Sequence, residues 1–597
     1  MSEVDKDDDL DGKVYDRQLM KRLLWYLRPY KRYIVISVIL LLGVAGLRLV
    51  GPYLTKTAID VYIANGDVDG LNTVGILYIV TLLLTFLFRF LQIYLTNVAG
   101  QRVMYDVRIA VYKHMNRLSL SYYDRNPVGK LITRVTNDIE ALNEMFSSGV
   151  VNIFGDVFTL VGIMIAMIWL DWKLAIITYM VLPILIWAAM IFRKKVRTAF
   201  HEVRRWVAGI NSSLQESITG MAVVQLFNRQ GRNFEEFEQT NKGHQDAYIE
   251  TIRYYAVFYP AVEIISAIAI GLIIWYGGGE VIQGALSLGV LIAFIQYVQL
   301  FFNPIYNLSE QYNTMQAAMA ASERLFAVLD EEPEIDDVTD PMEMESTTGE
   351  IEFRNVWFAY SEEEWVLRDV SFMVHSGQRA AFVGATGAGK TTIISLMCRF
   401  YDVQRGTILV DGVDIKNIRQ KDLRRHVGMV LQDVFLFSGT ILDNIRLWSD
   451  SISEDEARAA TTSVNALRFI EKLPEQLQTV LGERGNTLSV GQRQLLAFAR
   501  TLAHDPAILV LDEATSNIDT ETELLIQDAL EKLMAGRTSI IIAHRLSTIQ
   551  NADQIIVLHK GQVQESGTHQ DLLELRGVYF KLYQLQYKDQ EWVNQQI

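Results

Sequence analysis

The 597-residue sequence has little of three things: cysteine, proline and excess positive charge. Its one cysteine, Cys398, excludes an intrachain disulfide and suits a reducing compartment around that part of the chain. The formal net charge of −15 argues against a nucleic-acid partner, because phosphate backbones are bound by clustered Lys and Arg. With only ten prolines, long stretches of the chain are free of helix-breaking residues.

Apolar residues make up 50% of the chain, and they gather in long uncharged runs before about Phe302. A chain of this length exceeds what one core can organise, so we expect at least a membrane domain and a soluble domain. Roughly six runs have the length and apolarity of membrane-spanning helices. Their approximate limits are 33–54, 74–95, 146–170, 174–192, 256–276 and 286–302.

Lys and Arg are concentrated before the first apolar run and in the second and fourth loops between runs. The positive-inside rule therefore places both termini and these two loops in the cytoplasm, and we expect a multi-pass protein of the plasma (inner) membrane. The two loops are polar and helix-patterned, so we expect the membrane helices to continue beyond the bilayer. The acidic first residues resemble neither a secretory signal nor a transit peptide and are expected to be disordered.

The second half of the chain has ordinary soluble composition. We predict an N-terminal cytoplasmic segment (1–30), a transmembrane domain (31–328), an acidic linker (329–349) and a soluble domain (350–597). In the soluble domain, short β-type runs alternate with helical ones, which predicts an α/β fold with a largely parallel sheet. Asp411-Gly412, between two apolar runs, predicts a hairpin turn.

One stretch, from Phe382 to Thr392, matches the P-loop pattern without departure. An apolar strand-like run precedes it and a helix-like run follows it. Glycines let backbone N–H groups turn toward phosphate oxygens, and the helix N-terminus favours their negative charge. Lys390 is expected to reach the β- and γ-phosphates, and Thr391 to hold Mg²⁺. The predicted nucleotide-binding residues here are Gly384, Thr386, Gly387, Gly389, Lys390, Thr391 and Thr392.

A second chemical signal is a buried-type strand that ends in two carboxylates, Asp512 and Glu513. Asp512 can help to hold Mg²⁺, and Glu513 can polarise the water that attacks the γ-phosphate. A strand followed by acidic residues is weak evidence by itself. Following a complete P-loop in an α/β domain, it is strong evidence for nucleotide hydrolysis.

These motifs resemble the ATP-binding cassette superfamily, and specifically its exporters, in which a membrane domain is fused to the cassette. The resemblance covers nearly the whole chain. It implies that Tyr360 stacks on adenine, that Gln432 senses Mg²⁺ and the γ-phosphate, and that His544 contacts the γ-phosphate. Residues 482–485 and 516–519 match two further loops of these cassettes. Ser489, Gly491 and Gln492 match the signature motif, which in the family faces the P-loop of the other subunit.

The resemblance also implies the cofactors ATP and Mg²⁺. It makes Glu513, His544 and Gln432 the catalytic candidates, and Thr391, Gln432 and Asp512 the metal-binding candidates. The segments 122–129 and 224–230 resemble the short coupling helices that rest on the cassettes, and their aromatic residues can serve as packed anchors. Packing within the helical extensions is the alternative for these side chains.

Four charged residues interrupt the apolar runs: Arg48, Arg89, Asp156 and Glu263. Charges inside a membrane are costly and tend to face a cavity or another helix, although long side chains can also reach the interface. These residues identify no substrate.

The predicted fold is an α-helical six-span transmembrane domain fused to an α/β P-loop nucleotide-binding domain. The resemblance implies ATP-driven export of a hydrophobic or amphipathic compound, such as a drug, lipid or peptide, by alternating access. A nucleotide-gated channel or a regulatory membrane subunit is the alternative. The partners are then the lipid bilayer, the small-molecule or lipid substrate and a second half-transporter subunit, with no nucleic acid.

Val490 departs from the family pattern, because the usual exporter signature has a glycine there. Valine adds a branched side chain where backbone would otherwise approach a ligand closely. An altered signature would impair only the partner's site, and this favours a heterodimer. A homodimer that tolerates the valine is the alternative.

Overall fold

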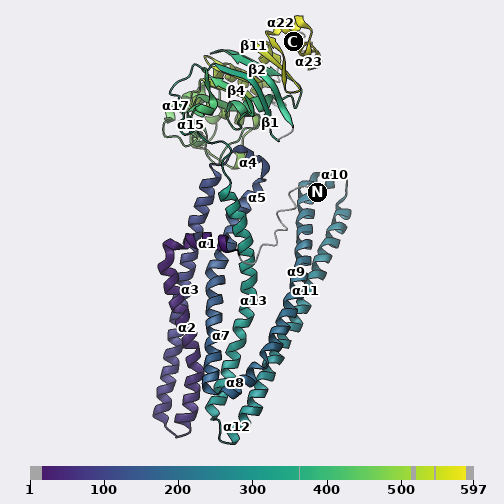
Figure 1. The fold of residues 1–597 in the computed structure, drawn as a ribbon. Coiled ribbons are helices and arrows are strands. Elements are labelled where there is room, and N and C mark those ends of the chain that lie inside the picture. The colour runs from purple at the N-terminus through teal and green to yellow at the C-terminus, as the bar shows by residue number, and fades with distance from the viewer. Residues whose placement is uncertain (1–15, 362–363, 513–519, 544–545, 587–597) are drawn as a thin grey trace. The chain divides into compact units, whose positions relative to one another are not determined.

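A computed structural model of the chain describes residues 16–361, 364–512, 520–543 and 546–586. The chain divides into two compact units. The first contains Pro127–Glu331 and the residues up to Arg117, and within its described part it is helical (Figure 1). The second contains Leu118–Asn126 and the residues from Glu332 onward. The acidic N-terminal residues for which we expect disorder lie outside the described ranges.

Long helices build the first unit. Five helical stretches are long and apolar enough to cross a membrane, and the apolar stretch Leu288–Phe302 is shorter. Five of the six predicted runs fall within the five long stretches, and the sixth, 286–302, begins two residues before its helix. The elements are α1 (Arg17–Leu27), α2 (Lys31–Thr57), α3 (Val68–Met115), α5 (Val128–Thr133), α6 (Ile139–Glu144), α7 (Val150–Leu170), α8 (Trp172–Tyr179), α9 (Leu182–Thr219), α10 (Met221–Leu226), α11 (Gln230–Leu272), α12 (Gly278–Ile282) and α13 (Leu288–Asp330).

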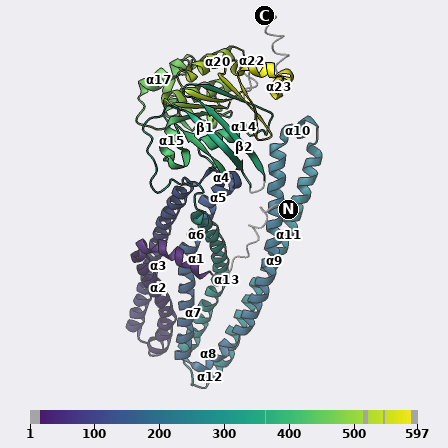
Figure 2. The same cartoon turned by 45° about the horizontal axis from the view of Figure 1, so that its top comes forward.

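The two long polar loops are helical, as their patterning predicts. The helix α3 continues to Met115, well beyond its apolar run. The end of α9 and the beginning of α11 are likewise polar helical turns that lie beyond the apolar runs. Figure 2 shows α9 and α11 lying side by side, joined at one end by the short helix α10. Because these segments are α-helical, their backbone groups are hydrogen-bonded internally and need no membrane or partner to satisfy them.

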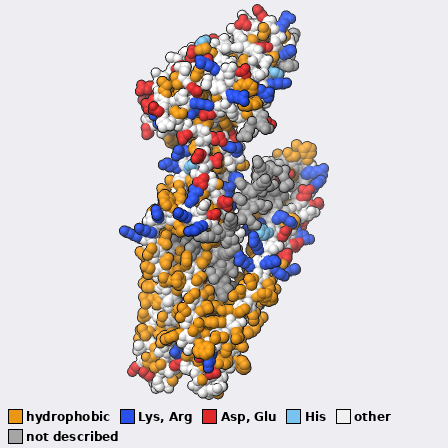
Figure 3. Space-filling model, in the orientation of Figure 1, with side chains coloured by type: hydrophobic (Ala, Val, Ile, Leu, Met, Phe, Trp, Pro, Cys, Tyr) orange, Lys and Arg blue, Asp and Glu red, His pale blue; other side chains and the backbone are white. Residues whose placement is uncertain are grey.

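The apolar side chains of the first unit face both inward and outward. Its core includes Phe294 and Tyr297 of α13, which are buried against α7, α8 and α11. Other apolar residues, such as Trp169 and Trp275, are 74% and 78% exposed. The face of the molecule in Figure 3 shows a broad hydrophobic surface over the long helices. A soluble protein rarely exposes so much apolar surface, and a lipid environment accounts for it.

Polar contacts tie α13 to the first helical hairpin. The Tyr297 hydroxyl donates to the Leu49 carbonyl at 2.6 Å, one turn before Pro52 of α2. Farther along, the Asp60 carboxylate accepts from the Ser287 hydroxyl at 2.5 Å and from the Gly289 N–H at 2.7 Å. A Cβ on Gly289 would lie 2.6 Å from the Asp60 Cγ, so the close approach needs glycine.

The charged residues within the apolar runs have different surroundings. Asp156 on α7 is buried, Arg48 on α2 is half-buried, and Arg48 interacts electrostatically with both Arg89 and Asp156. These three residues therefore form an interhelical group, which is one of the interpretations that the sequence allows. Glu263 is exposed on α11.

Among its described residues, the second unit has two larger sheets and one short two-stranded sheet. One has the order β12-β11-β3-β10-β9-β6 and is parallel from β11 to β6. The other, β2-β1-β4-β5, is antiparallel. The strands are β1 (Ile351–Ala359), β2 (Trp365–Val374), β3 (Arg379–Val383), β4 (Arg405–Val410), β5 (Val413–Asp414), β6 (Val427–Val430), β9 (Ile508–Asp512), β10 (Thr538–Ile542), β11 (Gln554–His559) and β12 (Gln562–Gly567), and the pair β7 (Gly439–Thr440) and β8 (Val480–Leu481) stands apart.

The largely parallel sheet that the sequence predicts is correct for the strands around the P-loop and wrong for β1 and β4. These two strands pair antiparallel because a short connection returns β1 onto β2, and β4 then adds to the free edge of β1. The hairpin at Asp411-Gly412 is confirmed: both residues have positive φ, and Val410 pairs with Val413.

Helices cover the parallel sheet. Alternate residues of β9 and β10 enter two separate cores, which explains why these strands are apolar throughout. Cys398 is buried in this unit, and burial raises the pKa of its thiol to about 12, which favours the neutral thiol of a core residue. The helices are α4 (Leu120–Arg125), α14 (Lys390–Met397), α15 (Gln420–His426), α16 (Ile441–Arg446), α17 (Glu454–Ser463), α18 (Leu467–Ile470), α19 (Val490–Ala503), α20 (Thr520–Met534), α21 (Leu546–Gln550), α22 (His569–Leu575) and α23 (Val578–Gln586).

Candidate functional site

The P-loop joins β3 to α14, as its sequence context predicts. Gly389 has a φ of 101°, and a Cβ there would lie 2.6 Å from Leu367. A Cβ on Gly384 would lie 2.4 Å from the Leu558 carbonyl oxygen. Both glycines are therefore required by the local backbone. No side chain caps the N-terminus of α14, so its first N–H groups are available to an anion.

Lys390 is the first residue of α14, and only 9% of it is exposed. Its ammonium donates to the Gly384 carbonyl at 2.7 Å and to the Ala385 carbonyl at 3.1 Å. Burial lowers the pKa of Lys390, and the nearby Asp512 carboxylate opposes that shift. The ammonium is thus held inside the loop by two neutral carbonyls, which a phosphate could replace with a stronger, charge-assisted contact.

Asp512 and Gln432 follow neighbouring strands of the parallel sheet. Asp512 ends β9, Gln432 comes two residues after β6, and Val430 pairs with Leu511. Because the strands run parallel, the two side chains leave the sheet at the same edge as the P-loop. Topological switch points at such edges are common ligand sites in α/β sheets.

Tyr360 follows β1 and is 52% exposed. Its hydroxyl donates to the Thr392 hydroxyl at 3.2 Å, which places the ring beside the start of α14. The Tyr401 ring meets it edge-on, with centroids 5.1 Å apart. An exposed aromatic face, supported from behind and next to the P-loop, suits adenine stacking.

The signature residues lie at the N-terminus of α19. The Ser489 hydroxyl accepts from the Gln492 N–H at 3.2 Å, and the Gln492 side chain accepts from the Ser489 N–H at 3.0 Å, forming a capping box. Gly491 is buried, and a Cβ there would lie 2.3 Å from Thr522. In the described part of the chain, no hydrogen bond joins these residues to the P-loop.

Val490 is 52% exposed at the first position of this helix. Its backbone is helical and its side chain points away from the core, so valine causes no strain within its own chain. Any effect of Val490 must therefore fall on whatever faces the start of α19.

Three further predicted features, Glu513, His544 and the loop 516–519, lie outside the described residues. Their neighbours are described: Asp512 ends β9, and β10 ends at Ile542, directly opposite Asp512. The two strands point toward the same edge as the P-loop.

The predicted metal-binding residues, Thr391, Gln432 and Asp512, provide a hydroxyl, an amide oxygen and a carboxylate. Among the described residues no group of three His, Cys, Asp or Glu side chains could hold a metal. This donor set fits Mg²⁺, which is usually held by one or two carboxylates together with substrate phosphates, rather than Zn²⁺.

The segment Leu118–Asn126, which contains α4, belongs to the same unit as the strands. The Ser119 hydroxyl accepts from the Ile335 N–H at 3.1 Å, Ser121 donates to Glu334 at 2.5 Å, and Arg125 forms an ion pair with Glu334. The Asp124 carboxylate accepts from the Tyr401 hydroxyl, so α4 reaches the tyrosine that supports Tyr360.

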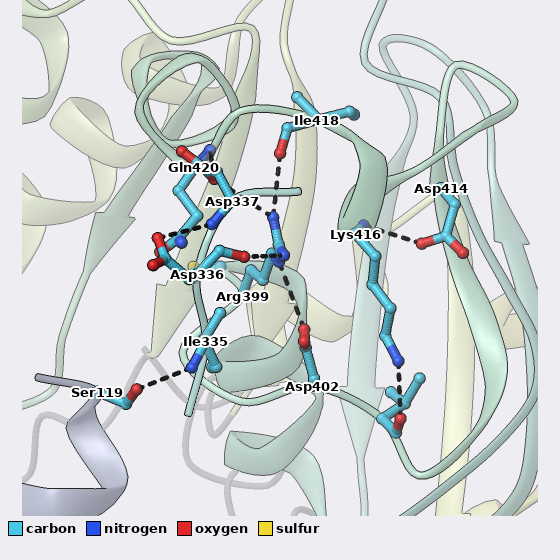
Figure 4. A network of polar contacts seen from close by, with 12 residues as sticks. Ser119, Ile335, Asp336, Asp337, Arg399, Asp402, Asp414, Lys416, Ile418 and Gln420 are labelled. Atoms are coloured by element: carbon cyan, nitrogen blue, oxygen red, sulfur yellow. Dashed lines mark hydrogen bonds and ion pairs between the residues drawn. The ribbon is translucent and has the colours of Figure 1, made fainter. Parts of the chain in front are cut away.

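Sequence reasoning did not identify Arg399, which holds the segment around Asp336 and Asp337, in the acidic stretch that precedes β1. This side chain is 2% exposed and donates to the Ile418 carbonyl at 3.0 Å and to the Asp336 carbonyl at 3.2 Å (Figure 4). The only sequence signal is an arginine next to the buried end of the P-loop helix. Buried Arg is rare unless paired, and Asp402 and Asp337 provide that pairing.

The counterpart segment 224–230 contains the end of α10. Leu226 and Phe227 are 75% and 66% exposed there. These apolar side chains are not buried within the first unit, which argues against simple packing inside the helical extension.

Comparison with known proteins gives consistent matches. The model of the ABC transporter transmembrane region matches residues 34–305, and the ABC transporter model matches residues 367–516. YknV, an uncharacterised ABC transporter ATP-binding protein of Bacillus subtilis, is 40% identical over 97% of this chain and 96% of its own length. An ATP-dependent lipid A-core flippase of Syntrophus aciditrophicus is 37% identical over 96% of this chain and 95% of its own.

Two further matches extend this pattern. The probable multidrug resistance ABC transporter ATP-binding/permease protein YheH of Bacillus subtilis is 38% identical over 87% of this chain and 77% of its own. A solved structure of a bacterial Atm1-family ABC exporter with ATP bound superposes with a TM-score of 0.77 at 29% identity. The match covers 93% of this chain and 98% of that one.

Proposed function

Because the chain belongs to the ABC transporter family and carries both the membrane region and the nucleotide-binding region, we propose that it is half of an ATP-driven exporter. Its cargo is a hydrophobic or amphipathic compound, moved across the plasma membrane by alternating access. The proposal rests on Lys390, which is buried at the N-terminus of α14, where no side chain caps the helix. The same chain contains helices long and apolar enough to cross a membrane.

In this proposal the nucleotide site is assembled from residues with separate tasks. Tyr360 stacks on adenine, Lys390 and the N–H groups at the start of α14 bind phosphates, and Thr391, Gln432 and Asp512 hold Mg²⁺. Bound Mg²⁺ would neutralise charge on the phosphates. Glu513 positions the attacking water, and His544 contacts the γ-phosphate. The segment Leu118–Asn126 and its counterpart around α10 carry the resulting motion to the membrane helices.

The relatives named as flippase and multidrug transporter support a lipid-like or drug-like cargo. The alternatives from the sequence, a nucleotide-gated channel and a regulatory subunit, predict no ATP-dependent accumulation. In inside-out vesicles we expect ATP to drive uptake of a lipophilic dye against its gradient, in step with ATPase activity. Equilibration of the dye without accumulation would point to a channel.

A labelling experiment tests the topology. We expect a cysteine at Gly279, in the short segment between α11 and α13, to react with a membrane-impermeant maleimide from outside the cell. Cysteines at Arg125 and Arg229 should react only after the membrane is opened. The buried, high-pKa Cys398 gives a silent background. Reaction of the Arg229 position from outside would overturn the proposed orientation.

The ATPase activity of the chain alone, with and without a substitution at Val490, distinguishes a heterodimer from a homodimer. We favour a heterodimer, in which the partner supplies a glycine-containing signature to this chain's intact P-loop. The chain expressed alone is then expected to hydrolyse ATP slowly, and Val490→Gly to raise the rate ~10-fold, which corresponds to about 1.4 kcal/mol. Full activity of the unmodified chain alone, measured as ATPase and vesicle uptake, would establish a competent homodimer instead.

A further inference from the structure

Three aromatic rings meet at the end of β1, beside the residue predicted to stack on adenine. Phe358 is buried and lies edge-on to Tyr360, with ring centroids 4.8 Å apart. The Tyr401 ring is edge-on to both, 5.6 Å from Phe358 and 5.1 Å from Tyr360. Edge-to-face packing of this kind sets the angle between the rings. The direction in which the Tyr360 ring faces therefore depends on Tyr401 as well as on the strand.

A second contact holds the backbone next to Tyr360. The Gln404 side-chain amide donates to the Ala359 carbonyl at 2.8 Å, and its oxygen accepts from the Ala359 N–H at 3.1 Å. Gln404 comes directly before β4, whose pairing with β1 ends at Trp357. Its side chain thus continues the hydrogen bonding of that strand pair beyond Trp357. Tyr401 and Gln404 belong to one short segment, and together they support the ring and the backbone of the adenine site.

The Tyr401 hydroxyl connects this group of rings to α4, where it donates to the Asp124 carboxylate. Burial raises the pKa of Tyr401, and the hydrogen bond to Asp124 raises it further, so the hydroxyl stays protonated and acts as the donor. Hydrogen bonds to a carboxylate are stronger than those between neutral groups. This contact therefore fixes the outer end of the Tyr401 ring, and with it the position of the edge that meets Tyr360.

The two places where α4 contacts the strand-containing part of its unit share one anchor. Besides Tyr401, α4 contacts Glu334. The buried Arg399 donates to the Asp336 carbonyl at 3.2 Å and forms an ion pair with Asp402 (Figure 4). Asp336 lies two residues after Glu334, and Asp402 is next to Tyr401. The helix α4 therefore lies on a surface that one buried side chain holds together.

We propose that Asp124 is a positioning residue for the nucleobase of ATP. By holding Tyr401, it keeps the Tyr360 ring in the orientation on which adenine stacks, and this role rests on the adenine site proposed above. The phosphates, bound at Lys390 and the start of α14, do not depend on the contact. Because coupling between two sites is reciprocal, bound adenine in turn stabilises α4 in its contact with Tyr401.

Isothermal titration of the full-length chain in detergent with adenylyl imidodiphosphate, an ATP analogue that is not hydrolysed, tests this role. We expect Tyr360→Leu to weaken binding about tenfold, as loss of a stacking ring does. Tyr401→Phe keeps the ring but removes the hydroxyl, and Asp124→Ala removes the acceptor. Each should weaken binding about threefold, within the range for one hydrogen bond. Asp124→Asn keeps an acceptor oxygen and should retain most of the affinity.

The same variants in a Tyr360→Leu background separate positioning of the ring from general loosening of the unit. If the contact acts through the Tyr360 ring, neither Tyr401→Phe nor Asp124→Ala weakens binding further once that ring is gone. The affinity of both variants for inorganic tripolyphosphate, which has no base, should equal that of the unmodified chain. Tyr30→Phe is the matched control, because it removes another hydrogen bond from a tyrosine hydroxyl to a carboxylate, that of Asp106, and should change neither affinity.

The outcomes distinguish this inference from the function on which it rests. Undiminished affinity in Tyr401→Phe and Asp124→Ala, or an equal loss in the Tyr360→Leu background, would overturn the role of Asp124 and leave the proposed exporter untouched. Unchanged affinity in Tyr360→Leu would overturn that role together with the proposed adenine site. Asp124 is exposed, and phenylalanine at position 401 keeps the packed ring, so both variants are expected to fold.

Discussion

Replacing Lys390 by alanine is expected to weaken ATP binding by about 10- to 100-fold, since a charge-assisted hydrogen bond contributes roughly 1.5–3 kcal/mol. The ammonium is buried, and it donates to the carbonyls of Gly384 and Ala385. A γ-phosphate would compensate this buried charge far better than those carbonyls do. Isothermal titration with ATP measures the loss directly.

Thermal unfolding separates loss of binding from loss of fold. Lys390→Ala removes a buried cation, so the melting temperature without nucleotide should hardly change, while the increase caused by added ATP should disappear. Lys416→Ala is the control, because the Lys416 ammonium also donates to a backbone carbonyl, that of Val403, at 3.0 Å (Figure 4). Unchanged ATP stabilisation in Lys390→Ala would refute the assigned role.

Glu513→Gln is expected to leave ATP binding intact and to slow hydrolysis by about 10²- to 10⁴-fold, the usual contribution of a positioned general base. The amide keeps the shape of the side chain but cannot accept the proton of the attacking water. Nucleotide should then remain trapped as ATP, which can be measured by rapid filtration followed by chromatography of the bound nucleotide.

Glu471→Gln, on an exposed surface of the same unit, controls for a general effect of removing a carboxylate. Normal turnover by Glu513→Gln would mean that another group positions the water. In a heterodimer whose partner lacks the corresponding glutamate, the single substitution should silence the whole transporter. In a homodimer the substitution inactivates both nucleotide sites at once. The activity of a mixed dimer of wild-type and variant chains therefore distinguishes the two cases.

Much of the fold could be predicted because its signals are local. The P-loop glycines are fixed by close backbone approaches, the hairpin at Asp411-Gly412 needs positive φ, and β9 and β10 are buried on both faces. Each of these requirements restricts the residues at a few neighbouring positions. A single sequence therefore carries them in readable form.

The features that escaped prediction depend on partners far away in the chain. The antiparallel pairing of β1 with β4 joins strands separated by the P-loop helix, and the apolar patterns of the two strands do not specify direction. In the sequence nothing distinguishes Arg399 from a surface arginine. In the fold it donates to the carbonyls of Asp336 and Ile418, which are distant in the chain. The Lys390 ammonium donates to two backbone carbonyls. Because every residue has a backbone carbonyl, no residue type in the sequence indicates these contacts.

The contacts of α4 determine which parts of the sequence must be exchanged together when cassettes are swapped between related transporters. Tyr401 and Glu334 meet side chains from Leu118–Asn126, although more than two hundred residues separate Glu334 from that segment. Exchanging the cassettes of two related transporters by a single cut after α13 would leave each cassette facing a foreign α4. A graft that preserves these contacts must move two separate pieces of sequence, so the unit of modular exchange is discontinuous.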